Sequence, residues 1–206
     1  MKNITIVDYG SGNVLSAQKS FIKISKDNNI QANVIISKNV NDIKNSTHVV
    51  LPGQGAFSTC MSGLQNTPGM IEELYDFALV KKKPFLGICV GMQMLAEASE
   101  ENGLHKGLGW IKGFIRPLPK KNLKMPHMGW NSVKPKQSNN LLSKAADYYF
   151  VHSYYFECQD RENILAETQY GINFTSIVGK ENIYGVQFHP EKSSSQGLNL
   201  IKNFIS

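Results

Sequence analysis

The first half of the chain alternates short apolar runs with segments of helical spacing. The apolar runs are 4–7, 33–36, 48–51 and 84–89, and helical spacing is found at 14–24, 70–80 and 92–98. A strand, a helix and a second strand in this order build a parallel βαβ unit, because the crossover packs the helix against one face of the sheet. The pattern predicts an α/β fold with a central, mostly parallel sheet flanked by helices.

The second half of the chain has the pattern of successive strands joined by short turns. Strands are expected at 110–118, 131–133, 148–155, 164–167, 174–178 and 183–188, and a helix at 198–205. Residues 180–182 form the turn of a hairpin between the last two strands. We expect this antiparallel portion to belong to the same mixed sheet, so that residues 1–206 form a single domain. The Lys-rich piece 119–124 is expected to be an exposed loop.

Composition narrows the classes of function. The 206 residues are 41% hydrophobic and 18% charged, which argues against disorder. The 22 Lys+Arg against 16 Asp+Glu give a formal net charge of +6, but only Arg116 and Arg161 are arginines. Two arginines leave little for bidentate recognition of bases or phosphates, so we expect no nucleic-acid partner. The lysines, including those at 81–83 and 120–124, are interpreted as solvated surface.

Cysteine usage indicates the compartment. The three cysteines, Cys60, Cys89 and Cys158, are odd in number and include no CxxC pair. A disulfide framework or a zinc site is therefore not expected, and a reducing cytoplasm fits best. The run 4–7 is far too short for a signal peptide, and no apolar stretch approaches the roughly 18–20 residues of a membrane span. We expect a cytoplasmic protein with no membrane partner and no metal.

The sharpest local signal is G-x-C-x-G at 87–91, where a predicted strand runs directly into a predicted helix. Small residues two before and two after Cys89 permit the strained turn that exposes a nucleophile. The start of the following helix favours the thiolate at that position. The alternative is an inert core cysteine, which the flanking glycines make the weaker interpretation.

A thiolate nucleophile needs a base, and the base needs an orienting group. Of five histidines, His189 stands out because the sequence continues with Pro190 and Glu191. Proline biases the residue before it towards extended backbone, in which residues two apart project to the same side. Glu191 can then accept a hydrogen bond from one imidazole nitrogen while the other faces Cys89. Alone, H-P-E would be a surface turn; paired with the cysteine motif, it predicts a triad.

A third piece is the Gly-rich turn after the run 48–51, which includes Gly53 and Gln54. If this strand neighbours the cysteine strand, backbone N–H groups of the turn and of Val90 can form an oxyanion hole. The motif alone is weak and usually means only a turn. A phosphate-binding loop is a poorer interpretation, since no G-K-[ST] follows.

Together these pieces resemble the class I, or triad, glutamine amidotransferases. Further segments resemble one branch of that family, the glutaminase subunits of imidazole glycerol phosphate synthases. The similar segments are D-Y-G-S-G-N at 8–13, G-I-C-V-G-M-Q at 87–93, P-H-M-G-W-N at 126–131, V-H-S-Y at 151–154 and G-V-Q-F-H-P-E-K-S at 185–193. One departure is Gln54, where the family more often carries Val.

The resemblance implies a class I glutamine amidotransferase-like fold and hydrolysis of L-glutamine to glutamate and ammonia without a cofactor. Cys89, His189 and Glu191 would be the catalytic triad. Gln93, Ser153 and Tyr154, with the Gly53 turn, would surround the glutamine. For Gln93 the alternative is a solvent-facing helix residue.

The same resemblance implies a partner. Ammonia would pass to a (β/α)8-barrel cyclase subunit in a heterodimer, which makes imidazole glycerol phosphate and an aminoimidazole carboxamide ribotide for histidine synthesis. Asn13, His152 and Lys192 would lie near this interface, although a solvated lysine is the alternative for Lys192.

Three alternatives stay open. A paralogous glutaminase could feed a surface-sugar pathway and keep every motif. A glutaminase of pyridoxal phosphate synthesis is disfavoured by the H-M-G-W-N and V-H-S-Y segments. A catalytically silent binding module is disfavoured by the intact Cys89, His189 and Glu191.

Overall fold

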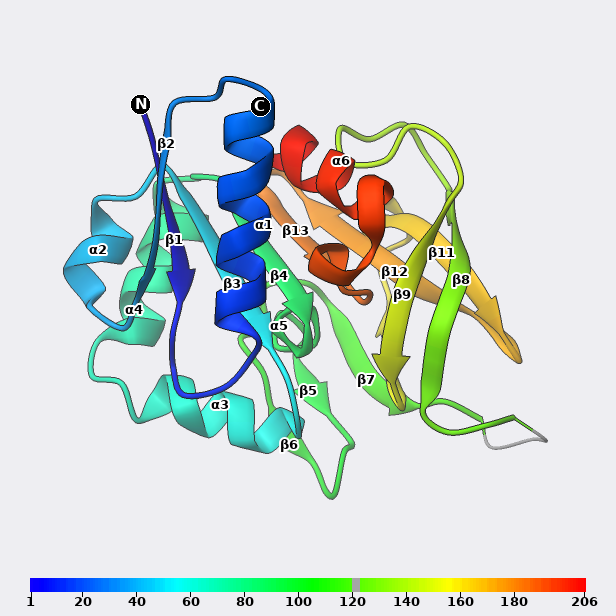
Figure 1. Cartoon of the computed structure of the whole chain (residues 1–206). Coiled ribbons are helices and arrows are strands. Elements are labelled where there is room, and N and C mark those ends of the chain that lie inside the picture. Colours follow the sequence, from blue (N-terminus) through cyan, green and yellow to red (C-terminus); the bar gives the residue numbers. More distant parts are fainter. Residues whose placement is uncertain (120–122) are drawn as a thin grey trace.

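The computed structural model describes residues 1–119 and 123–206, and its strands form one large mixed sheet (Figure 1). Five neighbouring strands run parallel, in the order β2 (Ala32–Ser37), β1 (Lys2–Val7), β3 (His48–Gly53), β4 (Phe85–Cys89) and β13 (Ile183–Val186). Strands β3 and β4 are buried along their whole length, as expected of central strands covered on both faces. The predicted α/β fold is confirmed.

Helices cover both faces of these parallel strands. Helices α1 (Val14–Asp27) and α6 (Ser194–Ile205) pack together over one face (Figure 1). The connection from β1 to β2 runs in one direction along the sheet, and those from β2 to β3 and from β3 to β4 run in the other. Because such crossovers are right-handed, the helices of the later connections lie on the opposite face. These are α2 (Val40–Lys44), α3 (Phe57–Gln65) and α4 (Met70–Tyr75). No helix in the described ranges combines the length and apolar character needed to cross a membrane.

Two of these helices bear on the predictions. Helix α4 continues into a π-helical turn at Asp76–Val80, so the expected helix over 70–80 is confirmed. Helix α3 was not predicted. Its buried residues nevertheless follow the i, i+3, i+4, i+7 spacing of one helix face: Phe57, Cys60, Met61 and Leu64.

The second half of the chain supplies the antiparallel part of the sheet. Strand β12 (Ile172–Lys180) pairs antiparallel with β13 across the turn at 181–182, which confirms the expected hairpin. The other strands of this part are β5 (Ala98–Ser99), β6 (His105–Lys106), β7 (Gly113–Pro117), β8 (His127–Pro135), β9 (Ala146–His152), β10 (Tyr154–Cys158) and β11 (Ile164–Tyr170). A 3₁₀ turn, Arg161–Asn163, precedes β11, and another, Pro190–Lys192, precedes α6.

The single strand expected over 148–155 is in fact two strands that meet at Ser153. Strand β9 pairs with β8, whereas β10 pairs with β7. The carbonyl of Ser153 accepts a hydrogen bond of 2.9 Å from the backbone N–H of Leu118, just past β7. The chain therefore changes pairing partner at this residue, and the break opens one wall of the cleft described below.

The prediction of a helix over 92–98 is wrong. Helix α5 is a single turn, Val90–Gln93, and the chain then turns through Met94–Glu97 into β5. The carbonyls of residues 94–96 accept hydrogen bonds from the backbone of 108–111 instead of continuing a helix. These residues are fully buried, so the apolar spacing that resembled a helix face reflects a tightly packed turn.

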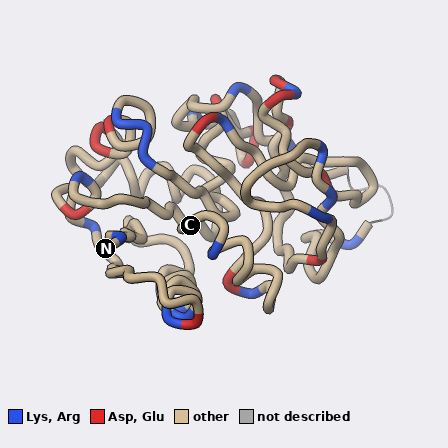
Figure 2. Tube along the Cα trace, turned by 90° about the horizontal axis from the view of Figure 1, so that it is seen from above, with Lys and Arg blue, Asp and Glu red and all other residues tan. Residues whose placement is uncertain are grey.

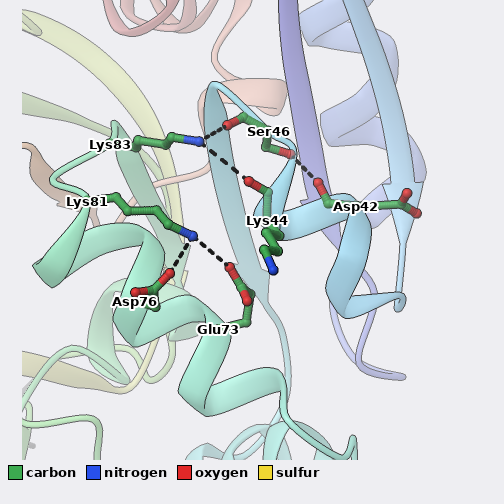
Figure 3. A network of polar contacts seen from close by, with 7 residues as sticks. All are labelled: Asp42, Lys44, Ser46, Glu73, Asp76, Lys81 and Lys83. Atoms are coloured by element: carbon green, nitrogen blue, oxygen red, sulfur yellow. Dashed lines mark hydrogen bonds and ion pairs between the residues drawn. The ribbon is translucent and has the colours of Figure 1, made fainter.

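Charged residues are spread along the chain, with Lys and Arg positions interspersed among Asp and Glu positions on the Cα trace (Figure 2). The interpretation of 81–83 as solvated lysines is confirmed for Lys81 and Lys82, which are exposed, whereas Lys83 is only half-buried and makes specific contacts. Lys83 donates to the backbone oxygen of Ser46 at 2.8 Å, and Lys81 contacts Asp76 and Glu73 (Figure 3). The Lys83 contact fastens the turn before β4 to the turn before β3, whereas the Lys81 contacts stay within the segment 73–81. Of the expected Lys-rich loop, residues 120–122 lie outside the described residues.

Candidate active site

Cys89 ends strand β4 in a strained conformation, with φ at +56°. Left-handed backbone is unfavourable for a residue with a side chain and requires support from its surroundings. The flanking glycines supply it by close packing. A Cβ on Gly87 would lie 2.5 Å from the Gly91 oxygen, and one on Gly91 would collide with the Leu51 oxygen of β3. The chain therefore needs glycine at both positions to hold Cys89 in this turn.

His189 and Glu191 form a buried pair beyond the end of β13. The Nδ1 atom of His189 lies 2.9 Å from Oε1 of Glu191, and both side chains are less than 5% exposed. The backbone of His189 is fixed to β9, since its N–H donates to the Tyr149 oxygen at 2.9 Å. A carboxylate accepts only, so Nδ1 carries a proton and Nε2 is the nitrogen left for proton transfer.

The charge of this pair is coupled to Cys89. Burial disfavours the imidazolium, but the neighbouring Cys89 and Glu191 outweigh burial and raise the pKa of His189 to about 10. At neutral pH the proton therefore resides on His189, opposite the cysteine sulfur. Within the described residues, Nε2 of His189 is buried and has no hydrogen-bond partner, so it is free to exchange a proton with a group in the cleft. Since α5 is only one turn long, the histidine rather than a helix dipole is the main support of a thiolate here.

Both groups open into one cleft of about 330 Å³. Cys89 and His189 contribute to its lining, together with the predicted Gln54, Val90, Gln93, Ser153 and Tyr154. Gly53 does not line the cleft but packs against Val90, which does: a Cβ on Gly53 would lie 2.8 Å from the Val90 Cβ. Four segments distant in sequence thus converge on one cavity.

The turn after β3 is held by the segment 8–13. The Tyr9 hydroxyl donates to the Pro52 oxygen at 2.6 Å, and the Ser11 hydroxyl donates to the Gln54 oxygen at 2.7 Å. Burial raises the pKa of Tyr9, so its hydroxyl stays protonated as a donor. The side chain of Gln54 is exposed, and its backbone forms the turn. The departure from Val at this position therefore concerns an exposed side chain, and the backbone contact of Gln54 with Ser11 does not depend on it.

Gln93 is buried at 3% exposure, so it is not a solvent-facing helix residue. Its Nε2 donates to the Tyr154 oxygen at 3.1 Å and to Oε1 of Gln187 at 3.0 Å. Gln187, which was not predicted, is fully buried and points its own Nε2 at the Cys89 sulfur, 3.7 Å away. The signal was present in the sequence, because Gln187 lies two residues before His189 and so projects to the same side of an extended chain.

The three residues expected near a partner lie in different settings. His152 is only 6% exposed and lines the cleft. Its Nδ1 lies 2.8 Å from the Tyr154 oxygen and its Nε2 lies 2.9 Å from Nδ1 of His127. Asn13, at the start of α1, is half-buried and Lys192 is exposed; neither lines the cleft.

An exposed apolar edge adjoins the cleft. Pro126 lines the cleft, and the next outward-facing residues along β8 are Met128 and Trp130, at 61% and 55% exposure. Within residues 1–119 and 123–206, no group of three or more His, Cys, Asp or Glu side chains is arranged to hold a metal ion.

Comparisons with known proteins identify the family of the chain. The family model described as glutamine amidotransferase class-I matches residues 5–206. The chain is 44% identical to the imidazole glycerol phosphate synthase subunit HisH of Rhodospirillum rubrum, over 98% of this chain and 97% of that one. It is 43% identical to the subunit of the same name from Pelagibacter ubique, over 99% of both.

Solved structures with lower identity share the fold. A glutamine amidotransferase superposes with a TM-score of 0.72 at 15% identity, over 98% of this chain and 96% of the other. A glutamine amidotransferase of Thermotoga maritima gives a TM-score of 0.67 at 18% identity, over 99% of this chain and 82% of that one.

Proposed function

Because the chain belongs to the class I glutamine amidotransferases, we propose that it is the glutaminase subunit of an imidazole glycerol phosphate synthase. The observation that carries the proposal is the convergence of Cys89 and the His189–Glu191 pair on one cleft. The identity to HisH subunits over nearly the whole chain supports the choice of synthase.

The first half-reaction forms a thioester. The Cys89 thiolate attacks the side-chain amide carbon of glutamine, and the carbonyl oxygen becomes an oxyanion. The N–H of Val90 and the turn at Gly53 and Gln54 stabilise that charge. The imidazolium of His189 then gives its Nε2 proton to the amide nitrogen, the C–N bond breaks, and ammonia leaves a γ-glutamyl thioester on the sulfur.

The second half-reaction releases glutamate. Neutral His189 takes a proton from water as the water oxygen attacks the thioester carbon. The C–S bond breaks, the thiolate returns, and His189 is again protonated. Glu191 accepts from Nδ1 throughout, which fixes the tautomer and stabilises the cation. Gln93, Ser153 and Tyr154 hold the glutamine in the cleft.

Ammonia has to reach its acceptor without entering bulk water, because ammonium lacks the nucleophilic lone pair. The proposal therefore includes a (β/α)8-barrel cyclase as a separate chain in a heterodimer. It would react the ammonia with a phosphoribulosyl-formimino substrate, which is thereby split into imidazole glycerol phosphate and an aminoimidazole carboxamide ribotide. The exposed Met128 and Trp130 beside the cleft are suited to docking it, with Asn13, His152 and Lys192 towards the same partner.

Two further parts of the proposal concern the chain as a whole. Residues 1–206 act as one glutaminase domain. A cytoplasmic location is consistent with three free cysteines, one of them the nucleophile.

The test uses the complex with the cyclase. Cys89→Ala is expected to abolish synthesis from glutamine while leaving synthesis from added ammonium salt. The matched control is Cys158→Ala, which removes another free cysteine and should keep both activities. Glutamine use retained by Cys89→Ala would overturn the proposal. Glutaminase activity with a surface-sugar cyclase but not with the histidine-pathway cyclase would overturn the choice of synthase.

A further inference from the structure

A continuous chain of hydrogen bonds reaches the sulfur of Cys89 from the cleft wall. The Tyr154 oxygen accepts from Nε2 of Gln93, the same Nε2 donates to Oε1 of Gln187, and Nε2 of Gln187 points at the cysteine sulfur. Gln93 and Gln187 are 3% and 0% exposed. Both amides therefore lie in protein rather than in solvent.

The direction of each bond follows from the first acceptor. A backbone oxygen cannot donate, so the Gln93 atom facing Tyr154 must be the NH₂ group. The second hydrogen of that NH₂ group then meets Gln187, whose facing atom must be the oxygen. The remaining end of Gln187 is its NH₂ group, and it faces Cys89. The orientation that aims an N–H at the sulfur is thus imposed by contacts outside the nucleophile.

We propose that Gln187 is a further catalytic residue, whose Nε2–H donates to the Cys89 sulfur and stabilises the thiolate before it attacks. Gln93 is the residue that positions it. The inference rests on the proposed role of Cys89 as the nucleophile and adds a donor that the triad does not contain.

The surroundings of Cys89 explain why a second donor is needed. Cys89 is only 4% exposed as a residue, so water contributes little to solvating a negative charge there. The one-turn α5 supplies little dipole. The imidazolium of His189 stabilises the charge through Nε2. Gln187, which directly follows the neighbouring strand β13, adds a neutral donor. A donor of this kind does not compete with His189 for the proton, because an amide does not titrate.

The titratable groups around the sulfur come from four segments. His189 follows β13, His152 ends β9, Glu101 lies after β5 and lines the cleft, and Tyr9 follows β1. None of these is changed by substitution at Gln187. A shift in the pH behaviour of Cys89 on such a substitution therefore reports the lost donor.

The test follows alkylation of Cys89 by iodoacetamide against pH in the complex with the cyclase, with the Cys89 peptide quantified by mass spectrometry. Gln187→Met keeps the volume and removes the donor. We expect the pH midpoint of alkylation to rise by about one unit, which is about tenfold less thiolate on the acid side. Above the midpoint the rate should equal or exceed that of the unmodified chain by up to about threefold, because a less stabilised thiolate is more nucleophilic.

The matched control is Ser176→Ala. Ser176 is fully buried on β12, and its backbone oxygen accepts from the N–H of Gln187, but its side chain is not a partner of Cys89. It should leave the midpoint unchanged. An unchanged midpoint in Gln187→Met, with only a lower plateau, would show that Gln187 is structural and overturn the inference.

Gln93→Met gives an independent test if Gln187→Met does not fold. It frees the Gln187 amide to turn its oxygen towards the sulfur, so the midpoint should rise in the same direction, and an unchanged midpoint counts against the inference. Glutamine hydrolysis by the unmodified complex is measured in parallel. Its absence would contradict the proposed function, whereas the alkylation profile judges the hydrogen bond alone.

Discussion

The Nδ1 atom of His127 lies 2.9 Å from the Nε2 atom of His152, deep between β8 and β9. The remaining contacts assign the protons. Nδ1 of His152 faces the Tyr154 oxygen and must donate, so Nε2 of a neutral His152 accepts from His127. Nε2 of His127 in turn accepts from the Asn131 amide at 3.1 Å. A proton added to either ring would place two N–H groups face to face.

His127→Phe is expected to release His152 from this arrangement. Phenylalanine keeps the ring stacked between Phe150 and Tyr170 but offers no donor. The pKa of His152, which burial lowers to about 3, should then rise by about one unit, because its Nε2 no longer faces an N–H. Nitrogen-15 NMR of the histidine rings measures both the tautomer and the titration.

His127→Asn is the matched control, because the asparagine amide nitrogen occupies nearly the position of Nδ1 and can still donate. It should preserve the titration of His152. Equal titration in the two variants would show that the donor has no influence on His152.

Acid stability should depend on the buried histidines. Burial lowers the pKa of His48 to about 4, of His127 to about 4 and of His152 to about 3. Below pH ~6.5 the unfolded chain binds protons that the folded chain does not, so stability falls as pH drops from ~6.5 towards 4.

Urea unfolding at several pH values tests this dependence, with stability expected to rise from pH ~4 to ~6.5. His48→Gln, which removes one of the buried titrating rings, should reduce the slope between pH ~6.5 and ~4 by about 1.4 kcal/mol per pH unit. The same slope in His48→Gln and in the unmodified chain would be the contrary result.

Local sequence patterns predicted the parts of the site that local backbone geometry builds. The G-x-C-x-G motif and H-P-E place their side chains through the turn and the extended segment that they themselves form. The features that were not predicted depend on hydrogen bonds between segments distant in sequence. The segment 92–98 has helical spacing, yet its carbonyls are taken by residues 108–111. The spacing of Gln187 to His189 gives the side of the chain on which Gln187 lies, but its contact with Cys89 depends on the pairing of β13 with β4, which lie far apart in sequence.

Close packing at the turn that holds Cys89 predicts that one added methyl group strongly lowers stability. In Gly91→Ala the new Cβ would collide with the Leu51 oxygen, which belongs to a buried central strand and has little room to move. We expect a loss of more than about 3 kcal/mol in the free energy of unfolding. Gly109→Ala is the control, since Gly109 has φ of +69° but open space around its Cβ position, and it should lose only about 1 kcal/mol. Similar losses in chemical denaturation would refute the packing argument.

The apolar edge of β8 predicts how the partner docks. Met128 and Trp130 are mostly exposed, so replacing both by alanine should change the stability of the isolated chain by no more than about 0.5 kcal/mol. Binding of the cyclase should weaken by about 2 kcal/mol, because a large aromatic side chain at the centre of an interface carries much of the binding energy. Isothermal titration calorimetry measures the affinity. Tyr75→Ala, which removes an aromatic side chain of similar exposure on α4, should bind the cyclase as the unmodified chain does. An equal loss of cyclase affinity in the two variants would show that Met128 and Trp130 have no special role in docking.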